Sequence, residues 1–347
     1  MRLSGASVGR LEAPTELINE NRASFQITGP LLARHGFAAS APPGGDSIGQ
    51  RPIEVHLKGF EAMGATVTRE GERIVLRAPN GLRGARIFMD YPSVTGTQNV
   101  LMAAVLARGH TTIVNAATEP EVEDLANMLC AMGANIDKIG TQILEIEGVD
   151  TLRGTSARVM PDRIEAGTYA IAAAITRGSV TIEGAPVNVM DALLAKLRAA
   201  GCGVTTGEGG ELGIRYEGPL KAVSFQALPY PGLATDLQAP LATLLTQAEG
   251  TSIIHERVFD NRMLYVEELR KMGADIAGSG SVAFVSGPRQ LTGARVRALD
   301  IRAGVSVMLA GLAARGTTVI DDGYHLDRGY GRLDEKLRAL GAAVERA

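Results

Sequence analysis

The sequence contains no tryptophan, only two cysteines and only five histidines among its 347 residues. Cys130 and Cys202 each stand beside a glycine-containing helix end, where a small apolar side chain suits a protein core. We therefore expect two free thiols in a reducing compartment rather than a disulfide. The histidines show no metal-ligand spacing, so we predict no metal site, and we expect no cofactor.

Strong charge and long apolar runs are also missing. The formal net charge is −3, which gives no reason to expect binding to nucleic acid or to an acidic membrane. No apolar run reaches transmembrane length, and the N-terminus lacks the apolar core of a signal peptide. Hydrophobic residues make up 45% of the chain and charged residues 21%, which is typical of a globular protein. These features predict a cytoplasmic chain long enough for two domains.

One sequence pattern recurs about every 70 residues. In each copy a helix-like segment ends in glycine, which is followed by a small residue and a strand-like segment. Glycine suits the left-handed position that follows a helix. A period near 70 is too long for the common solenoids, so it indicates larger α/β units. The five glycines are Gly64, Gly133, Gly201, Gly273 and Gly341.

A second pattern, offset from the first, supports the same repeat. Here an apolar helix ends in glycine and leads into a β-branched strand, at Gly36 (a weaker copy), Gly109, Gly178, Gly250 and Gly316. Most units add one more strand. We therefore predict units that run helix, strand, helix, strand, strand, with the last strand at residues 73–76, 143–146, 212–215 and 282–285.

The phase of the repeat predicts two domains. Residues 1–160, which include the glycine-rich loop described next, would hold two units, and residues 161–347 three, the last without its closing strand. Because an unpaired strand edge is a liability, we expect that a further N-terminal unit and a pairing strand are missing. The alternative is a natural architecture of five units.

A loop at residues 42–52 combines Gly44 and Gly45 with one acid, Asp46, and one base, Arg51. The glycines allow the backbone to bend freely. Pro52 suits the first turn of the helix that follows. The loop is a candidate mobile segment that carries catalytic groups, and a solvated turn is the plainer alternative.

Several predicted helices begin beside an arginine. Capping accounts for Ser93, Thr235 and Asp300 at such positions. Capping does not require a cation, because a positive charge at a helix N-terminus opposes the helix dipole. An anionic ligand held between the two would resolve this conflict. The arginines concerned are Arg22, Arg163 and Arg302.

Three more arginines, Arg51, Arg262 and Arg328, lie on other loops. Arginine recognises both phosphate and carboxylate by paired hydrogen bonds. The set therefore fits a substrate that is phosphorylated and carboxylated. A surface ion pair is the alternative for each arginine taken singly.

These motifs resemble the enolpyruvyl transferase family, and within it the branch that acts on UDP-N-acetylglucosamine. The resemblance runs from about Ala13 to Ala347 and implies a two-domain inside-out α/β barrel with its active site in the interdomain cleft. A shikimate-specific member of the family would not carry the same set. The matching stretches are residues 29–34, 43–52, 119–121, 161–165, 235–238, 259–262, 300–302 and 324–330.

The resemblance implies transfer of enolpyruvyl from phosphoenolpyruvate to the 3′-hydroxyl of UDP-N-acetylglucosamine, an early step of bacterial peptidoglycan and cell-wall synthesis that supports cell shape and division. Asp46 takes the position of the loop acid and Asp236 that of the base. Arg51 and Arg328 take positions that clamp phosphoenolpyruvate. Further charges and residues that handle the UDP-sugar are implied at Arg22, Arg51, Pro52, Ile53, Glu54, Val55, Ser93, Val94, Arg163, Asp236, Arg262, Asp300 and Arg302.

Three departures from the family pattern matter. Asp46 replaces the usual loop cysteine. A partly buried carboxylic acid can still donate a proton, but it forms no thioether, so we predict insensitivity to the epoxide fosfomycin. Thr118 replaces a common arginine, and the family's Lys-Asn pair has no counterpart. The alternative function is therefore a truncated or non-catalytic paralogue that binds UDP-sugars.

Overall fold

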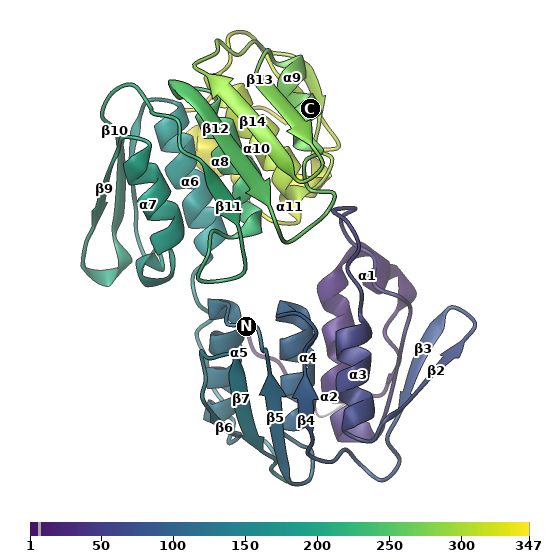
Figure 1. The fold of residues 1–347 in the computed structure, drawn as a ribbon. Helices are drawn as coiled ribbons and strands as arrows, with labels where there is room; N and C mark the ends of the chain where they lie inside the picture. Colours follow the sequence, from purple (N-terminus) through teal and green to yellow (C-terminus); the bar gives the residue numbers. More distant parts are fainter. Residues whose placement is uncertain (6–7, 347) are drawn as a thin grey trace. The chain divides into compact units, whose positions relative to one another are not determined.

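The computed structural model describes residues 1–5 and 8–346, which form two compact units (Figure 1). Unit 1 comprises Met1–Gly45 and Arg51–Met160. Unit 2 comprises Asp46–Gln50 and Pro161–Ala347. The tip of the glycine-rich loop therefore belongs to unit 2, whereas the residues on either side of it belong to unit 1.

Unit 1 contains two mixed α/β segments. Its sheets have the strand orders β1-β3-β2 and β4-β5-β7-β6. Its elements are α1 (Thr15–Glu20), the 3-10 helix η1 (Arg22–Ile27), α2 (Thr28–His35), β1 (Phe37–Ser40), α3 (Glu54–Ala62), β2 (Thr66–Glu70), β3 (Arg73–Arg77), β4 (Arg86–Phe88), α4 (Val94–Ala104), β5 (His110–Val114), α5 (Pro120–Ala131), β6 (Asn135–Asp137) and β7 (Ile143–Glu147).

Unit 2 has three such segments, with sheets β8-β10-β9, β11-β12-β14-β13 and β15-β16. Its elements are α6 (Arg163–Ile175), β8 (Ser179–Ile182), η2 (Val187–Val189), α7 (Asp191–Ala199), β9 (Cys202–Thr206), η3 (Glu208–Gly210), β10 (Leu212–Tyr216), β11 (Phe225–Ala227), η4 (Thr235–Leu237), α8 (Gln238–Leu245), β12 (Gly250–Glu256), α9 (Tyr265–Lys271), β13 (Asp275–Ser279), β14 (Val282–Gly287), β15 (Arg295–Arg297), α10 (Ile301–Ala313), β16 (Val319–Asp321), α11 (Tyr324–Asp327) and α12 (Leu333–Ala339).

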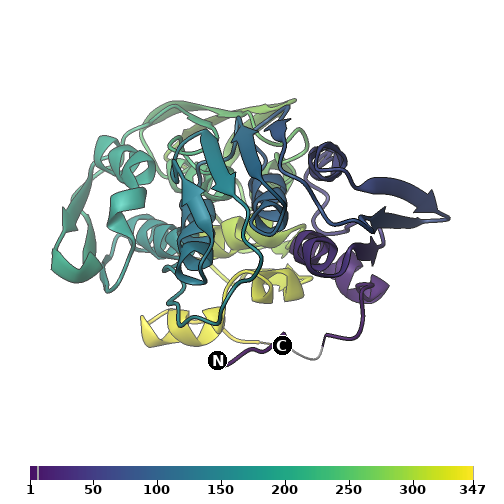
Figure 2. The same ribbon diagram turned by 90° about the horizontal axis from the view of Figure 1, so that it is seen from below.

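The predicted repeat is confirmed by the backbone. All five glycines of the first pattern have positive φ, between 89° and 104°, as a left-handed residue after a helix requires. The strand topology repeats as well, because β4-β5-β7-β6 and β11-β12-β14-β13 each join one parallel pair to two antiparallel pairs. In both views the β2–β3 hairpin projects from unit 1 and the β9–β10 hairpin from unit 2 (Figures 1 and 2).

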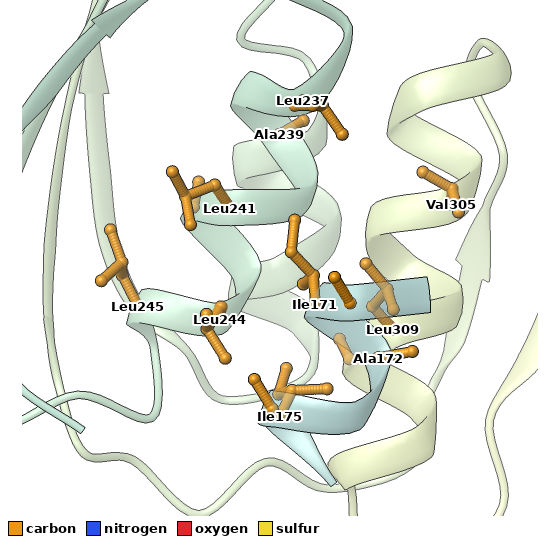
Figure 3. Close-up of a cluster of buried hydrophobic side chains, with 14 of the residues drawn as sticks. Ile171, Ala172, Ile175, Leu237, Ala239, Leu241, Leu244, Leu245, Val305 and Leu309 are labelled. Carbon is orange, nitrogen blue, oxygen red and sulfur yellow. The ribbon is translucent and has the colours of Figure 1, made fainter. Parts of the chain in front are cut away.

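The core of unit 2 forms where three helices meet. Every residue of α8 is buried, as are residues 303–310 of α10. A helix that is buried all round carries mainly apolar and small side chains. Figure 3 shows Ile171 and Ile175 of α6 beside Leu241 and Leu244 of α8 and Leu309 of α10. In β12 and β14, in contrast, buried residues alternate with more exposed ones, so one face of this sheet packs inward and the other faces outward.

Three local predictions are wrong. Pro52 precedes α3 by two residues, because the helix begins at Glu54. Thr235 does not cap a helix, since its hydroxyl bonds to another side chain. Residues 342–346, which the first pattern predicts to be a strand, form none.

Candidate active site

Asp236 is the centre of the charged cluster in unit 2. It lies in η4, directly before α8, and accepts hydrogen bonds from Arg262 Nη2 and Arg302 Nη2, each at 2.7 Å. Its side chain is 33% exposed, whereas those of Arg262 and Arg302 are 5% and 14% exposed. Arg302 belongs to the first turn of α10, so the N-terminal ends of α8 and α10 meet at this carboxylate.

The two arginines control the charge of Asp236. Burial alone would raise the pKa of this carboxyl, but the charges and hydrogen bonds of Arg302 and Arg262 outweigh burial and lower the pKa well below its usual range. In the same way, burial disfavours the charged form of Arg302, and Asp236 more than offsets this and raises its pKa. In this arrangement Asp236 is a strongly held carboxylate, which accepts a proton only if an arginine moves away.

Glu256 extends the cluster on its other side. It lies at the end of β12, is 2% exposed, and accepts hydrogen bonds from Thr235 Oγ1 at 2.7 Å and from the backbone of Val258 at 2.7 Å. Arg262 Nη1 donates to the same Thr235 hydroxyl at 2.8 Å. Burial raises the pKa of Glu256. Thr235 thus links a second buried carboxyl group to Arg262.

Tyr330 holds the far side of Arg302. Its hydroxyl lies 2.9 Å from Arg302 Nη1 and 2.9 Å from Thr168 Oγ1 of α6. Tyr330 is only 1% exposed, so the ring is fixed by packing. Asp300, predicted as a substrate contact, caps α10 by accepting from the backbone of Arg302 and Ala303. Both contacts therefore orient the first turn of α10.

The loop tip meets Arg328 within unit 2. Asp46 Oδ1 lies 2.5 Å from Arg328 Nη1, and the Asp46 side chain is 14% exposed. Asn261 holds the next two residues, because its Nδ2 donates to the carbonyl of Ser47 at 3.1 Å and its backbone N–H to that of Ile48 at 3.2 Å. The predicted acid and the predicted phosphoenolpyruvate clamp are thus ion-paired here.

Arg163 is the first residue of α6. Its guanidinium lies over the Tyr230 ring, 5.9 Å from the ring centre. Both side chains line a small hollow that also includes the start of α7 at Asp191. The capping prediction for this helix start is met by Asp162, which accepts from the backbone of the first turn.

Arg22 contacts two of the other predicted residues of unit 1. Arg22 Nη2 donates to the carbonyl of Arg51 and, at 3.3 Å, to that of Pro52. The Pro52 carbonyl also accepts from the Tyr91 hydroxyl at 3.1 Å. Burial and the neighbouring charge of Arg51 lower the pKa of Arg22. Arg22 therefore fixes the backbone of the loop's C-terminal flank.

The remaining predicted residues of unit 1 have mixed environments. Ile53 and Val55 are buried and pack in the core, whereas Glu54 is exposed. Ser93 caps α4 by accepting from Gly96, as predicted, and Val94 begins that helix. The side chains of Ile53 and Val55 thus support the local fold.

A buried polar network supports this part of unit 1. Asn99 Nδ2 lies 3.0 Å from His56 Nδ1 and 3.0 Å from Thr28 Oγ1, while Asn99 Oδ1 accepts from the backbone of Gly29 at 2.8 Å. Burial lowers the pKa of His56 to about 4, with a smaller effect from Arg22. His56 is therefore a neutral structural residue that joins α3 to α2 and α4.

Three comparisons place this architecture among known proteins. Residues 2–337 match the family model described as EPSP synthase (3-phosphoshikimate 1-carboxyvinyltransferase). The crystal structure of the enolpyruvyl transferase NikO from Streptomyces tendae aligns with a TM-score of 0.85 at 27% identity, covering 97% of this chain and 80% of that chain. An EPSP synthase structure from Acinetobacter baumannii, at 19% identity, aligns with a TM-score of 0.73 over 93% of this chain and 78% of its own, and shows the shared fold.

The chain therefore belongs to the EPSP synthase family and is an enolpyruvyl transferase. Within the family it is 50% identical to the UDP-N-acetylglucosamine 1-carboxyvinyltransferase of Saccharophagus degradans, over 98% of this chain and 81% of that protein. It is also 50% identical to the enzyme of the same name from Hyphomonas neptunium, over 99% of this chain and 81% of that protein. None of its described helices is long and apolar enough to cross a membrane.

Several residues of the charged cluster were not predicted from the sequence as site residues. Glu256 and Tyr330 contact predicted residues through the tertiary fold, Thr168 contacts Tyr330, and His325 contacts both Asp46 and the nearby Arg328. Two of them, His325 and Tyr330, lie in the motif at residues 324–330. Their closeness to Arg328 in the sequence could have indicated that they belong to the site. The free state of Cys130 and Cys202, in contrast, agrees with the prediction.

Proposed function

We propose that this chain transfers the enolpyruvyl group from phosphoenolpyruvate to the 3′-hydroxyl of UDP-N-acetylglucosamine, with release of phosphate. This reaction would serve peptidoglycan synthesis. The observation that carries the proposal is the charged cluster of unit 2, in which three arginines pair with two carboxylates, in a chain 50% identical to enzymes named for this reaction.

The reaction needs an acid, a base and cationic groups for its anions. Addition protonates the methylene carbon of phosphoenolpyruvate and joins the sugar oxygen to the neighbouring carbon, which requires a general acid and a general base. Elimination then removes a proton from the new methyl group and expels phosphate. In the proposal Asp46 donates the first proton and Asp236 accepts the proton of the sugar hydroxyl.

Arginines would stabilise the charge that moves during these steps. Arg328 and Arg51 are proposed to hold the phosphate and carboxylate of phosphoenolpyruvate. Arg22, which fixes the backbone of residues 51 and 52, would keep that flank in place for the UDP-sugar. Further UDP-sugar contacts are proposed at Pro52–Val55, Ser93, Val94, Arg163 and Arg262, with Asp300 and Arg302 completing the charged set.

Ion pairing in the unliganded chain bears on these roles. Asp236 is held by Arg262 and Arg302, and Asp46 is held by Arg328. An anionic substrate that takes an arginine from either carboxylate would weaken that pair and leave the carboxylate a better proton acceptor. The proposal therefore couples binding of the substrate to activation of both groups.

The test is release of inorganic phosphate from phosphoenolpyruvate, with and without UDP-N-acetylglucosamine. We expect release only when both substrates are present, and a loss of at least about 100-fold in the D236N variant, the scale of a lost general base. D275N, which removes an exposed carboxylate of β13, is the matched control. Binding of UDP-N-acetylglucosamine without any phosphate release would instead support the non-catalytic UDP-sugar-binding paralogue.

A further inference from the structure

A third titratable side chain lies against the pair formed by Asp46 and Arg328. His325 of α11 has its Nδ1 atom 3.9 Å from Asp46 Oδ1 and 3.5 Å from Arg328 Nη1. The His325 side chain is 17% exposed. The Tyr324 ring stacks on it with the ring centres 4.2 Å apart, which fixes the plane of the imidazole. A carboxyl, a guanidinium and an imidazole thus share one small, mostly covered site.

Arg328 contacts both Asp46 and His325. Its Nη1 atom faces both Asp46 Oδ1 and His325 Nδ1. The separation of 3.9 Å between these two atoms is roughly 1 Å longer than a hydrogen bond. A guanidinium that turns toward a substrate anion leaves this gap, and a small movement of either side chain then brings the imidazole and the carboxyl into direct contact.

Other charges near His325 do not compete for it. The charged side chains that the described contacts place against His325 are Asp46 and Arg328, and Tyr324 adds a phenol. The neighbouring helix α10 packs on α11, but its Arg302 is directed to Asp236 and Tyr330. The imidazole is therefore available to the loop acid.

We propose that His325 supplies Asp46 with the proton that Asp46 passes to phosphoenolpyruvate, an inference that rests on the proposed function. The Nδ1–H bond of the imidazolium breaks and an O–H bond forms on Asp46. His325 becomes the neutral Nε2–H tautomer, and a solvent hydronium ion then returns a proton to the vacant Nδ1 atom. The transfer replaces an ion pair by a neutral pair, which the burial of both side chains favours.

The proton from His325 would allow Asp46 to act as a general acid. Paired with Arg328, Asp46 is a hydrogen-bond acceptor and has no proton to donate. Binding of the substrate to Arg328 and loading of Asp46 by His325 would then be linked events, so that the acid is charged only when its substrate is present. His325 acts through Asp46 and does not touch the substrate, so it is a positioning residue.

The experiment compares phosphate release by wild-type protein, H325Q and H325A across pH. His255 of β12, which is not part of the charged cluster, provides the matched control H255Q. We expect kcat of H325Q to fall about 10- to 100-fold, with KM for phosphoenolpyruvate changed less than about threefold. The pH profile of kcat in H325Q should lose one ionisation relative to that of the wild type. Free imidazole should restore part of the activity of H325A.

The outcomes separate this inference from the proposed function. A wild-type kcat at every pH in a folded H325Q protein, checked by circular dichroism and thermal melting, would overturn the role of His325. A raised KM with unchanged kcat would overturn it too, because His325 would then only orient Arg328. Should H325Q not fold, the imidazole dependence of H325A decides, and no rescue counts against the proposal. A wild-type protein that releases no phosphate contradicts the proposed function itself.

Discussion

Replacement of Asp236 by asparagine tests whether this carboxylate holds two buried arginines in place. The side chain of Asn has nearly the same shape but no charge, so D236N leaves Arg262 and Arg302 buried without their anion. Removing one partner from a buried ion pair costs about 3–5 kcal/mol. Because Asp236 is one-third exposed, solvent compensates for part of this, and we expect a loss of about 2–3 kcal/mol.

Hydrogen exchange is the suitable assay, because two units make a single unfolding free energy ambiguous. Amides in the buried part of α10 should exchange roughly 30- to 150-fold faster in D236N at neutral pH, since each 1.4 kcal/mol is tenfold. The control D275N breaks an exposed pair with Arg289, whose side chain is 57% exposed, and should change exchange by at most about fivefold.

The pH dependence provides the second arm of this test. The pKa of Asp236 is lower in the folded chain than its unfolded value of about 3.9, so the unfolded chain binds the proton more readily. The stabilising contribution is therefore complete above about pH 4 and is lost as the pH falls toward the folded value. The difference between wild type and D236N should narrow below about pH 4. Equal exchange in D236N and D275N at pH 7 would refute the reasoning.

Three further predictions follow from other sites. D46C should become inactivated by fosfomycin in a time-dependent way while the wild type is not, and inhibition of both alike would contradict this. The pKa of His56 in the folded chain is about 4, so the unfolded chain binds a proton at a higher pH than the folded chain does. Unit 1 should therefore lose about 3 kcal/mol of stability as the pH falls from about 6.5 to about 4. Hydrogen exchange in α4 should show this loss in the wild type and not in H56Q. G29A should destabilise unit 1 by at least about 2 kcal/mol, because its Cβ would lie 2.3 Å from the Asn99 carbonyl oxygen, whereas G154A, which has open space, should leave thermal melting unchanged.

The repeat could be predicted from the sequence because it depends on local backbone geometry. Where a helix is followed by a left-handed residue, glycine is the residue that takes this conformation most easily. Gly64 and Gly133 therefore mark helix ends without any knowledge of tertiary contacts. The strands that follow also show their own β-branched patterns. The strand predicted to begin at Thr317 begins instead at Val319, where pairing with β15 starts. Element ends are thus set by the partner strand, which the local pattern does not contain.

The ion-pair partners in the charged cluster could not be predicted from the sequence. Arg302 and Asp236 are 66 residues apart, and Asp46 and Arg328 are 282 residues apart. The conflict between a cation and the helix dipole predicted an anionic ligand beside Arg302. It did not show that the partner in the unliganded chain is a carboxylate of the protein. The side chains of Thr235 and Glu256 were missed for the same reason, because a single hydroxyl between two charged groups leaves no periodic signal.

Both proposed proton-transfer groups, Asp46 and Asp236, are paired with arginines. Without Asp236 the buried cations Arg262 and Arg302 would repel each other, and without Asp46 the charge of Arg328 would lack this partner. The two carboxylates therefore compensate charges that the substrate would otherwise have to neutralise. An incoming phosphate or carboxylate replaces this compensation, since arginine pairs with either group. Each carboxylate released in this way faces a less positive environment and holds a proton more strongly. Chemistry at this site therefore depends on the anions of the substrate, and a neutral analogue that binds without displacing an arginine should not activate it.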